Sequence, residues 1–202
     1  SNYTITYETA TLTVSATSQS TLTLTSTSGT YGTTLKLTTS GGSGTGAVSY
    51  STSSAGCSIT NTDSLTVTGA ITCSVTATKA ADSNYNSASS SATNVVFATR
   101  SITITAANKS ATYTGSTVSV SNSYTISSGT LVGSDTFTSL TYTYTSASPS
   151  YNSTTAPTAA GTYTITPSAA NFTTGSASNY TITYETATLT VSATSQSTLT
   201  LT

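Results

Sequence analysis

The chain has 202 residues, of which 55 are Thr and 40 are Ser, while only nine are charged and His, Met and Trp are absent. The formal net charge of −1 includes no basic patch that could neutralise phosphates, so nucleic-acid binding is not expected. Without imidazole or paired carboxylates we expect no catalytic site, metal site or cofactor, and no apolar run in this fragment is long enough to span a membrane.

Alternation of apolar and hydroxyl residues begins at the first residues. In Tyr3-Thr4-Ile5-Thr6-Tyr7 the odd positions are large and apolar and the even positions are Thr. This period of two is typical of a half-buried β-strand, and Thr suits the solvent face because it is both β-branched and polar. The same pattern predicts strands, in chain order, at 12–14, 22–24, 35–37, 48–50, 65–67, 71–75, 95–97, 102–104, 118–120, 140–144, 163–165, 180–184 and 189–191.

Gly-containing turn signals separate these segments, among them Ser40-Gly41-Gly42-Ser43-Gly44 and Ala160-Gly161. No segment has the pattern of an amphipathic helix. A disordered, Ser/Thr-rich stalk is the alternative, but the strict alternation and the low charge oppose it. We therefore predict an all-β chain of tandem immunoglobulin-like antiparallel β-sandwiches.

The same sequence occupies residues 1–25 and 178–202, so one repeat period runs from Ser1 to Ala177. This period is too long for one immunoglobulin-like sandwich and suits two in tandem. We predict an Ig-like domain A at 19–100 and a domain B at 101–195. Residues 1–18 would be the C-terminal hairpin of a preceding domain B, ordered only if a preceding repeat or another chain supplies its sheet. Residues 196–202 would be the first strand of the next domain A.

Domain B carries Gly161-Thr-Tyr-Thr-Ile-Thr-Pro-Ser-Ala-Ala-Asn171 and Asn179-Tyr-Thr-Ile-Thr-Tyr-Glu-Thr-Ala-Thr-Leu-Thr-Val191. In these motifs it resembles the bacterial "mostly beta, glycine-rich" (MBG) repeat domain. It departs from that pattern at Ala187, where Gly is usual, and at Tyr113-Thr114-Gly115, which splits a Tyr-Gly pair. Domain A, through Gly32–Tyr50 and Cys73–Lys79, looks like a bacterial Ig-like repeat found beside such domains.

The resemblance implies a tandem repeat of a bacterial surface adhesin, stalk or fibre, located at the cell surface or secreted. It implies a spacer with roles in cell adhesion or biofilm matrix, and it transfers no catalytic residue. Neighbouring identical repeats would be the partners, and the nearly uncharged, Thr-rich strand edges allow lateral self-association. Two alternatives remain open: a filament subunit joined by β-strand addition, and a module that binds a glycan or a host protein.

Cys57 and Cys73 are the only cysteines. Cys57 lies two residues before Ile59, and Cys73 lies two residues from both Ile71 and Val75, so in a strand each thiol is on the same face as these apolar side chains. Both thiols should therefore face the core from adjacent strands. We predict a disulfide between them and hence an extracellular compartment. Two buried free thiols are the alternative, whereas a metal site is disfavoured because two Cys without His leave its coordination incomplete.

Besides the sequon at Asn2, whose repeated copy is at Asn179, four Asn-x-Ser/Thr sequons would allow N-linked glycans. They begin at Asn108, Asn152, Asn171 and Asn179.

Overall fold

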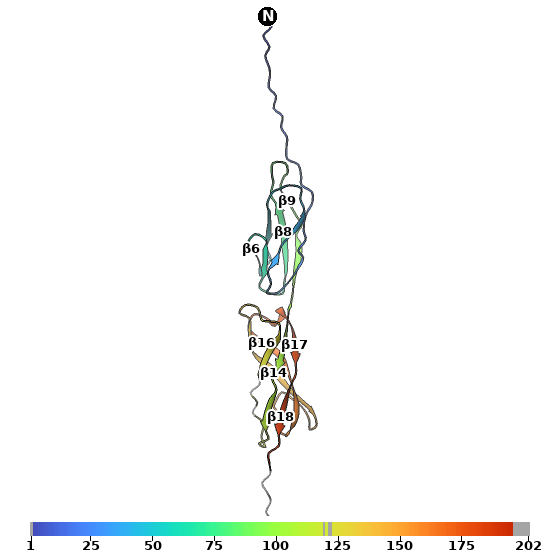
Figure 1. The fold of residues 1–202 in the computed structure, drawn as a ribbon, viewed down its shortest axis with the longest axis vertical. Coiled ribbons are helices and arrows are strands. Elements are labelled where there is room, and N and C mark those ends of the chain that lie inside the picture. Colours follow the sequence, from blue (N-terminus) through green and yellow to red (C-terminus); the bar gives the residue numbers. More distant parts are fainter. Residues whose placement is uncertain (1, 119, 121–122, 196–202) are drawn as a thin grey trace, which may run out of the picture. The chain divides into compact units, whose positions relative to one another are not determined.

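The computed structural model describes residues 2–118, 120 and 123–195, and the chain divides into two compact units (Figure 1). Unit 1 contains residues up to Thr27 together with 34–66 and 72–95, and unit 2 contains 28–33, 67–71 and the chain from Val96 onward. Every regular element in the described residues is a strand, apart from the 3-10 helix η1 (Ala177–Asn179). The all-β class is therefore confirmed. No described helix is long and apolar enough to cross a membrane.

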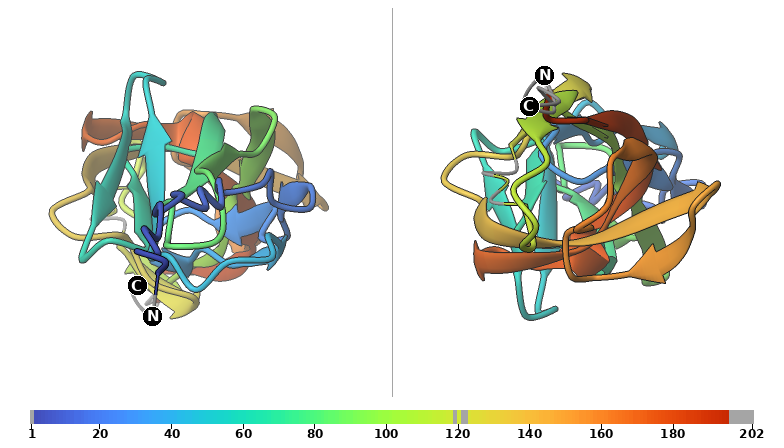
Figure 2. Two further views of the ribbon diagram at one scale, coloured as in Figure 1. Left: turned by 90° about the horizontal axis from the view of Figure 1, so that it is seen from above. Right: turned by 90° about the horizontal axis from the view of Figure 1, so that it is seen from below.

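Unit 1 is built from short strands in three groups, whose bounds and order are as follows. β1 (Leu22–Leu24) pairs with β4 (Thr39–Gly41); β3 (Leu35–Lys36), β7 (Ser64–Val67) and β6 (Cys57–Thr60) form a second sheet; β8 (Thr72–Lys79) lies between β5 (Val48–Thr52) and β10 (Thr93–Ala98), and β9 (Ala88–Ser89) also pairs with β8. The β6–β7 hairpin, teal in Figure 2, lies at the outside of this unit. The buried side chains of unit 1 include Leu22, Leu37, Leu65, Cys73, Val75 and Val95.

Unit 2 has longer strands in two sheets. In sheet order these are β13 (Tyr124–Ser128), β11 (Arg100–Ala106) and β17 (Tyr180–Glu185), and then β12 (Lys109–Thr112), β18 (Ala187–Ser192), β16 (Gly161–Thr174), β14 (Thr136–Ala147) and β15 (Ser150–Ser153). The end of β10 also pairs here with β2 (Ser28–Thr30). Residues 28–33 and 67–71, expected in domain A, thus cluster with unit 2. The boundary between residues 100 and 101 stays a prediction.

Parallel pairing corrects the expectation of purely antiparallel sandwiches. β11 runs parallel to β17, β12 runs parallel to β18, and β10 runs parallel to β2. The long central pair β14–β16 is antiparallel, as expected. Alternation reveals which side chains point inward, but it carries no information about the direction of the neighbouring strand, so the parallel pairs could not be read from it.

Two clusters of buried side chains form the core of unit 2. One lies where β11 meets β17 and contains Tyr31, Ile102, Ile104, Phe137 and Tyr180. The other lies where β12 meets β18 and contains Ala106, Val118, Tyr144, Tyr163, Ile165, Leu189 and Val191. The first and last segments of the unit therefore supply side chains to both clusters.

The strand expected at Val118–Val120 is absent, because Val118 and Val120 lie outside any strand and Ser119 is outside the described residues. Val118 is nevertheless 5% exposed, and its backbone N–H donates to the carbonyl oxygen of Pro157 at 3.0 Å. A loop therefore supplies the backbone partner that the prediction assigned to a strand.

The two copies of the repeated sequence have different environments. In residues 180–192 the copy forms β17 and β18, with Leu189 fully buried and Tyr180 only 6% exposed. In residues 3–15 the same sequence forms no strand, and Tyr3 and Leu12 are 90% and 87% exposed. The predicted strand at 196–202 lies outside the described residues.

Candidate functional site

The most distinctive feature of unit 2 is the parallel pairing of its first and last segments. Ile102 lies beside Ile182 and Lys109 lies beside Leu189, so β11–β17 and β12–β18 share one register offset of 80 residues. We call the paired residues 99–113 and 180–194 the terminal ladder. It passes from the three-stranded sheet into the five-stranded sheet without a change of register.

Side chains reinforce the terminal ladder near the end of β11 and in the interval before β12 begins. The Thr105 hydroxyl donates to Glu185 Oε2 at 2.7 Å, and three residues later Asn108 Oδ1 accepts the backbone N–H of Thr188 at 2.9 Å. Beyond β12, the backbone N–H of Tyr113 donates to the Ser192 carbonyl oxygen at 2.8 Å. The Asn108 side chain therefore takes the place of a backbone acceptor in the interval between the strands.

The terminal ladder fixes the path of the chain through unit 2. Residue 100 lies beside residue 180, residue 112 lies beside residue 192, and both segments run in the same direction. The chain therefore begins the unit at one end and leaves it at the opposite end. Figure 1 shows β17 and β18 following one another along the unit. At about 3.3 Å per residue, residues 100–112 span roughly 40 Å.

A carboxylate and two tyrosines lie at the start of the terminal ladder. Asp135 Oδ2 accepts the hydroxyl of Tyr180 at 2.6 Å and the hydroxyl of Tyr31 at 2.9 Å. The Tyr180 oxygen also accepts the backbone N–H of Val132 at 2.8 Å. Burial, followed by the hydrogen bond to Asp135, strongly raises the pKa of Tyr180. This cluster therefore favours the neutral phenol in the folded state.

We expect unit 2 to lose stability in alkali. Tyr180 has an ordinary pKa of 10.0, and because its pKa is raised in the folded protein, its contribution is complete below pH 10.0 and declines as the pH rises towards the folded value. Denaturant titrations from neutral pH to pH 11 measure this loss. The Tyr180→Phe variant should show a shallower decline and Tyr3→Phe the decline of the parent chain; equal slopes for all three would contradict the assignment.

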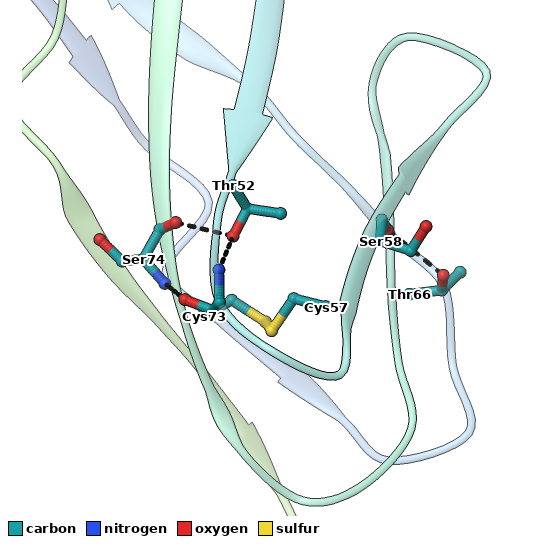
Figure 3. Close-up of a disulfide and its surroundings, with 7 residues drawn as sticks. Thr52, Cys57, Ser58, Thr66, Cys73 and Ser74 are labelled. Carbon is teal, nitrogen blue, oxygen red and sulfur yellow. Dashed lines mark hydrogen bonds between the residues drawn. A yellow bond between two sulfur atoms is a disulfide. The ribbon is translucent and has the colours of Figure 1, made fainter.

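The predicted disulfide is present in unit 1, where Cys57 in β6 bonds to Cys73 in β8 with an S–S distance of 2.00 Å (Figure 3). The expectation that the two cysteines lie on adjacent strands is wrong, because β6 and β8 belong to different sheets. The alternation of apolar residues predicted that both thiols face the core, but it could not show to which sheet each strand belongs. Beside the bond, the Thr52 hydroxyl donates to the Ser74 carbonyl oxygen at 2.8 Å. The disulfide therefore ties two sheets of unit 1 together.

Three of the four sequon asparagines, Asn108, Asn152 and Asn171, have exposed side chains. Asn179 is only 9% exposed, and its Oδ1 accepts the backbone N–H of Ala70 at 3.0 Å. Asn179 is therefore far less accessible than the other three asparagines, and glycosylation at all four stays a prediction. The sequon could not reveal this because the burial depends on residues 67–71, which are far away in the sequence.

Other charged side chains make structural contacts within unit 1. Lys36 Nζ lies 3.7 Å from Asp63 Oδ2 at an exposed position. Asp82 Oδ2 accepts the backbone N–H of Thr45 at 2.6 Å, and this bond, with those from Asn84 and Tyr85, lowers the pKa of Asp82. No group of three or more metal-ligating side chains occurs among the described residues.

An open depression of about 390 Å³ lies on unit 2. Its lining consists of Ser123, Tyr124, Thr138, Ser139, Leu140 and Tyr142. Tyr124 is 36% exposed and stacks on Phe137, with 4.9 Å between the ring centroids. The depression offers hydroxyl groups and aromatic surface but no charge.

Comparison with known families gives one match. Residues 102–190 match the family described as MBG domain (YGX type). The matched range begins in β11 and ends in β18, so its two ends are the paired segments of the terminal ladder. The chain is thus all-β, and its residues 102–190 are similar to an MBG domain. A comparison with curated proteins finds no match.

Sequence reasoning missed the terminal ladder and the contacts of Asp135. One signal for the ladder was present: Ile102 and Ile104 alternate in the same phase as Ile182 and Tyr184, as expected for parallel partners offset by 80 residues. No local pattern marked Asp135, because its two tyrosine partners are 45 and 104 residues away.

Proposed function

We propose that the chain is a non-enzymatic structural repeat of a long bacterial surface adhesin, stalk or fibre, in which both units are immunoglobulin-like sandwiches that act as spacers. The observation that carries this proposal is the repeated sequence of residues 1–25 and 178–202, in which residues 3–14 are exposed whereas their counterparts at 180–191 contribute Tyr180, Leu189 and Val191 to the core. The path of the chain through unit 2, from one end to the other, suits a spacer.

The free energy of burying the apolar side chains of residues 2–14 supports the tandem array. Each fully buried Leu or Val contributes roughly 1.5–3 kcal/mol relative to an exposed one. Leu189 and Val191 are buried, whereas Leu12 and Val14, at the same positions of the repeated sequence, are 87% and 85% exposed. A preceding unit of the same kind would bury this surface, so residues 2–14 fit the role of closing strands in a tandem array.

Two further observations support a surface location. The disulfide in unit 1 suits an oxidising compartment outside the cytosol. The MBG domain at residues 102–190 is of a type that suits surface proteins. Roles in cell adhesion and in a biofilm matrix belong to this proposal, with neighbouring repeats as the partners.

The present chain, and the same chain extended at its end by one and by two copies of residues 26–202, test the spacer function, because each copy adds one period in phase. If each period adds two units in sequence along the chain, and each unit spans roughly 40 Å, the maximum dimension in small-angle X-ray scattering grows by about 80 Å per period. Electron microscopy of the same samples measures the increments directly. Growth that stops after one period, as in a collapsed assembly, would overturn the proposal.

Strand addition between chains is the second candidate, favoured by the exposed apolar side chains of residues 2–14. In that case these residues would replace β17 and β18 of another copy and join chains into filaments. Sedimentation over a range of protein concentrations separates the two candidates. The spacer remains monomeric, because β17 and β18 of each chain already complete its own unit 2, whereas the filament subunit polymerises.

The depression beside Tyr124 and Tyr142 favours the third candidate, a glycan-binding or host-protein-binding module. Aromatic faces next to hydroxyl groups are suited to contact with a sugar ring. A glycan array probed with the parent chain and with Tyr124→Ala tests this candidate. Binding that Tyr124→Ala abolishes would support it, and the absence of binding would leave the spacer function alone.

A further inference from the structure

We propose that the terminal ladder of unit 2 is a mechanical clamp, which resists tension applied along the chain. This inference goes beyond the spacer function, because a spacer needs only length, whereas a clamp needs a particular geometry of load and strands. It rests on contacts within unit 2 alone. A tandem array would supply the tension, but the clamp is a property of a single chain.

The direction of the load follows from the path of the chain. Tension along the chain enters the terminal ladder at residue 99, where its first segment begins, and leaves it at residue 194, where its last segment ends. Because residue 100 pairs with residue 180 and residue 112 pairs with residue 192, these two points lie at opposite ends of the ladder. Tension therefore pulls two parallel, paired segments in opposite directions along their own axes.

This geometry loads the hydrogen bonds together. In a parallel pair the backbone hydrogen bonds are evenly spaced along the strands, so sliding one strand past the other strains all of them at once. If the same strands were pulled apart at one end, the bonds would break one after another, and each step would require little force. The six residue pairs of β11–β17 and the four of β12–β18 must therefore yield in one event.

Two features prevent the ladder from failing in halves. The Asn108 side chain bonds to the backbone N–H of Thr188 between the two strand pairs, so the connection continues across the interval. Each half is also anchored in its own buried cluster, through Ile104 and Tyr180 in one and through Leu189 and Val191 in the other. Sliding by one residue would turn these side chains out of both clusters, because successive residues of a strand face opposite sides.

The strands β14 and β15 lie outside the load path. They belong to the stretch between the two ladder segments, and β15 pairs only with β14 among the described strands. Substitutions at exposed positions of β15 leave both the ladder and its two buried clusters intact, so they supply matched controls.

Single-molecule pulling on the whole chain tests the clamp by changing only the points of attachment. Handles on Ser101→Cys and Ala193→Cys load the ladder along its axis, and handles on Ser110→Cys and Ser192→Cys peel it from one end. All four positions have exposed side chains, and the native cysteines are joined to each other. At one loading rate we expect a rupture force several-fold higher for the first pair. Equal forces, or a higher force for the second pair, would overturn the proposal.

Asn108→Ala gives a second readout on the axial attachment points. Removing the Asn108 acceptor should lower the rupture force, while Asn152→Ala, the same substitution at an exposed position of β15, should leave it unchanged. Denaturation midpoints of both variants are measured beside the forces, because a merely structural role would move force and midpoint together. Equal forces for both variants would count against the role of Asn108. None of these results depends on the scattering series of multi-period chains, so the clamp and the tandem array can fail separately.

Discussion

Leu189→Ala is expected to lower the free energy of unfolding of unit 2 by about 2–5 kcal/mol, the usual cost of removing a fully buried leucine side chain. Leu189 is 0% exposed and belongs to the cluster with Tyr163 and Ile165. Leu12→Ala makes the same change within the other copy of the repeated sequence, and we expect it to leave stability unchanged because Leu12 is 87% exposed. Denaturant unfolding of both variants measures the difference.

A longer chain turns this pair of substitutions into a test of the tandem array. Joining residues 19–177 in front of Ser1 supplies a unit 2, with its residues 28–33 and 67–71, that lacks only its closing strands. In that chain Leu12→Ala should become as costly as Leu189→Ala, because residues 2–14 then complete a core of their own. If Leu12→Ala still leaves the free energy of unfolding unchanged in the longer chain, the exposed copy does not close a preceding unit, and the spacer proposal loses its main support.

Removal of the disulfide is expected to destabilise unit 1 and not unit 2. The two cysteines are 16 residues apart, and closing a loop of this size stabilises a fold by roughly 3 kcal/mol in the chain-entropy description. The Cys57→Ser/Cys73→Ser double variant should therefore unfold in unit 1 at a clearly lower denaturant concentration. Hydrogen exchange resolved along the sequence measures the two units separately.

The parent chain under reducing conditions is the control for that variant. Reduction should lower the denaturant concentration at which unit 1 unfolds by a similar amount, and it should have no further effect on the double variant. Unit 2, which contains no cysteine, serves as the reference within each sample. An unchanged stability of unit 1 after both treatments would show that the link between its sheets is dispensable.

Alternation predicted the strands and their buried faces well. It placed Tyr163 and Ile165 on one face, and Leu189 and Val191 on one face, and all four are buried. It succeeded because a strand presents successive side chains to opposite sides, so burial is encoded within a few neighbouring residues. The same local signal brought Cys73 into the core and so led to the disulfide.

Features that depend on distant residues were not predictable. The parallel partner of β11 is 80 residues away, and alternation is the same whichever way a partner runs. Asn179 looked like an acceptor for a glycan until the fold brought Ala70 to its side chain. Val118 was assigned to a strand, although a loop carbonyl at Pro157 supplies its hydrogen bond.

Because the register of the terminal ladder is constant, the end-to-end length of unit 2 does not depend on how many residues lie between the two ladder segments. Because residues 100–112 and 180–192 set the two ends, residues between them add bulk to the side and not to the distance travelled by the chain. A peptide inserted at the exposed turn between β14 and β15, which lies outside the terminal ladder, would enlarge the unit and leave its span unchanged. Unit 2 could thus serve as a carrier of foreign loops whose spacing along a polymer stays constant.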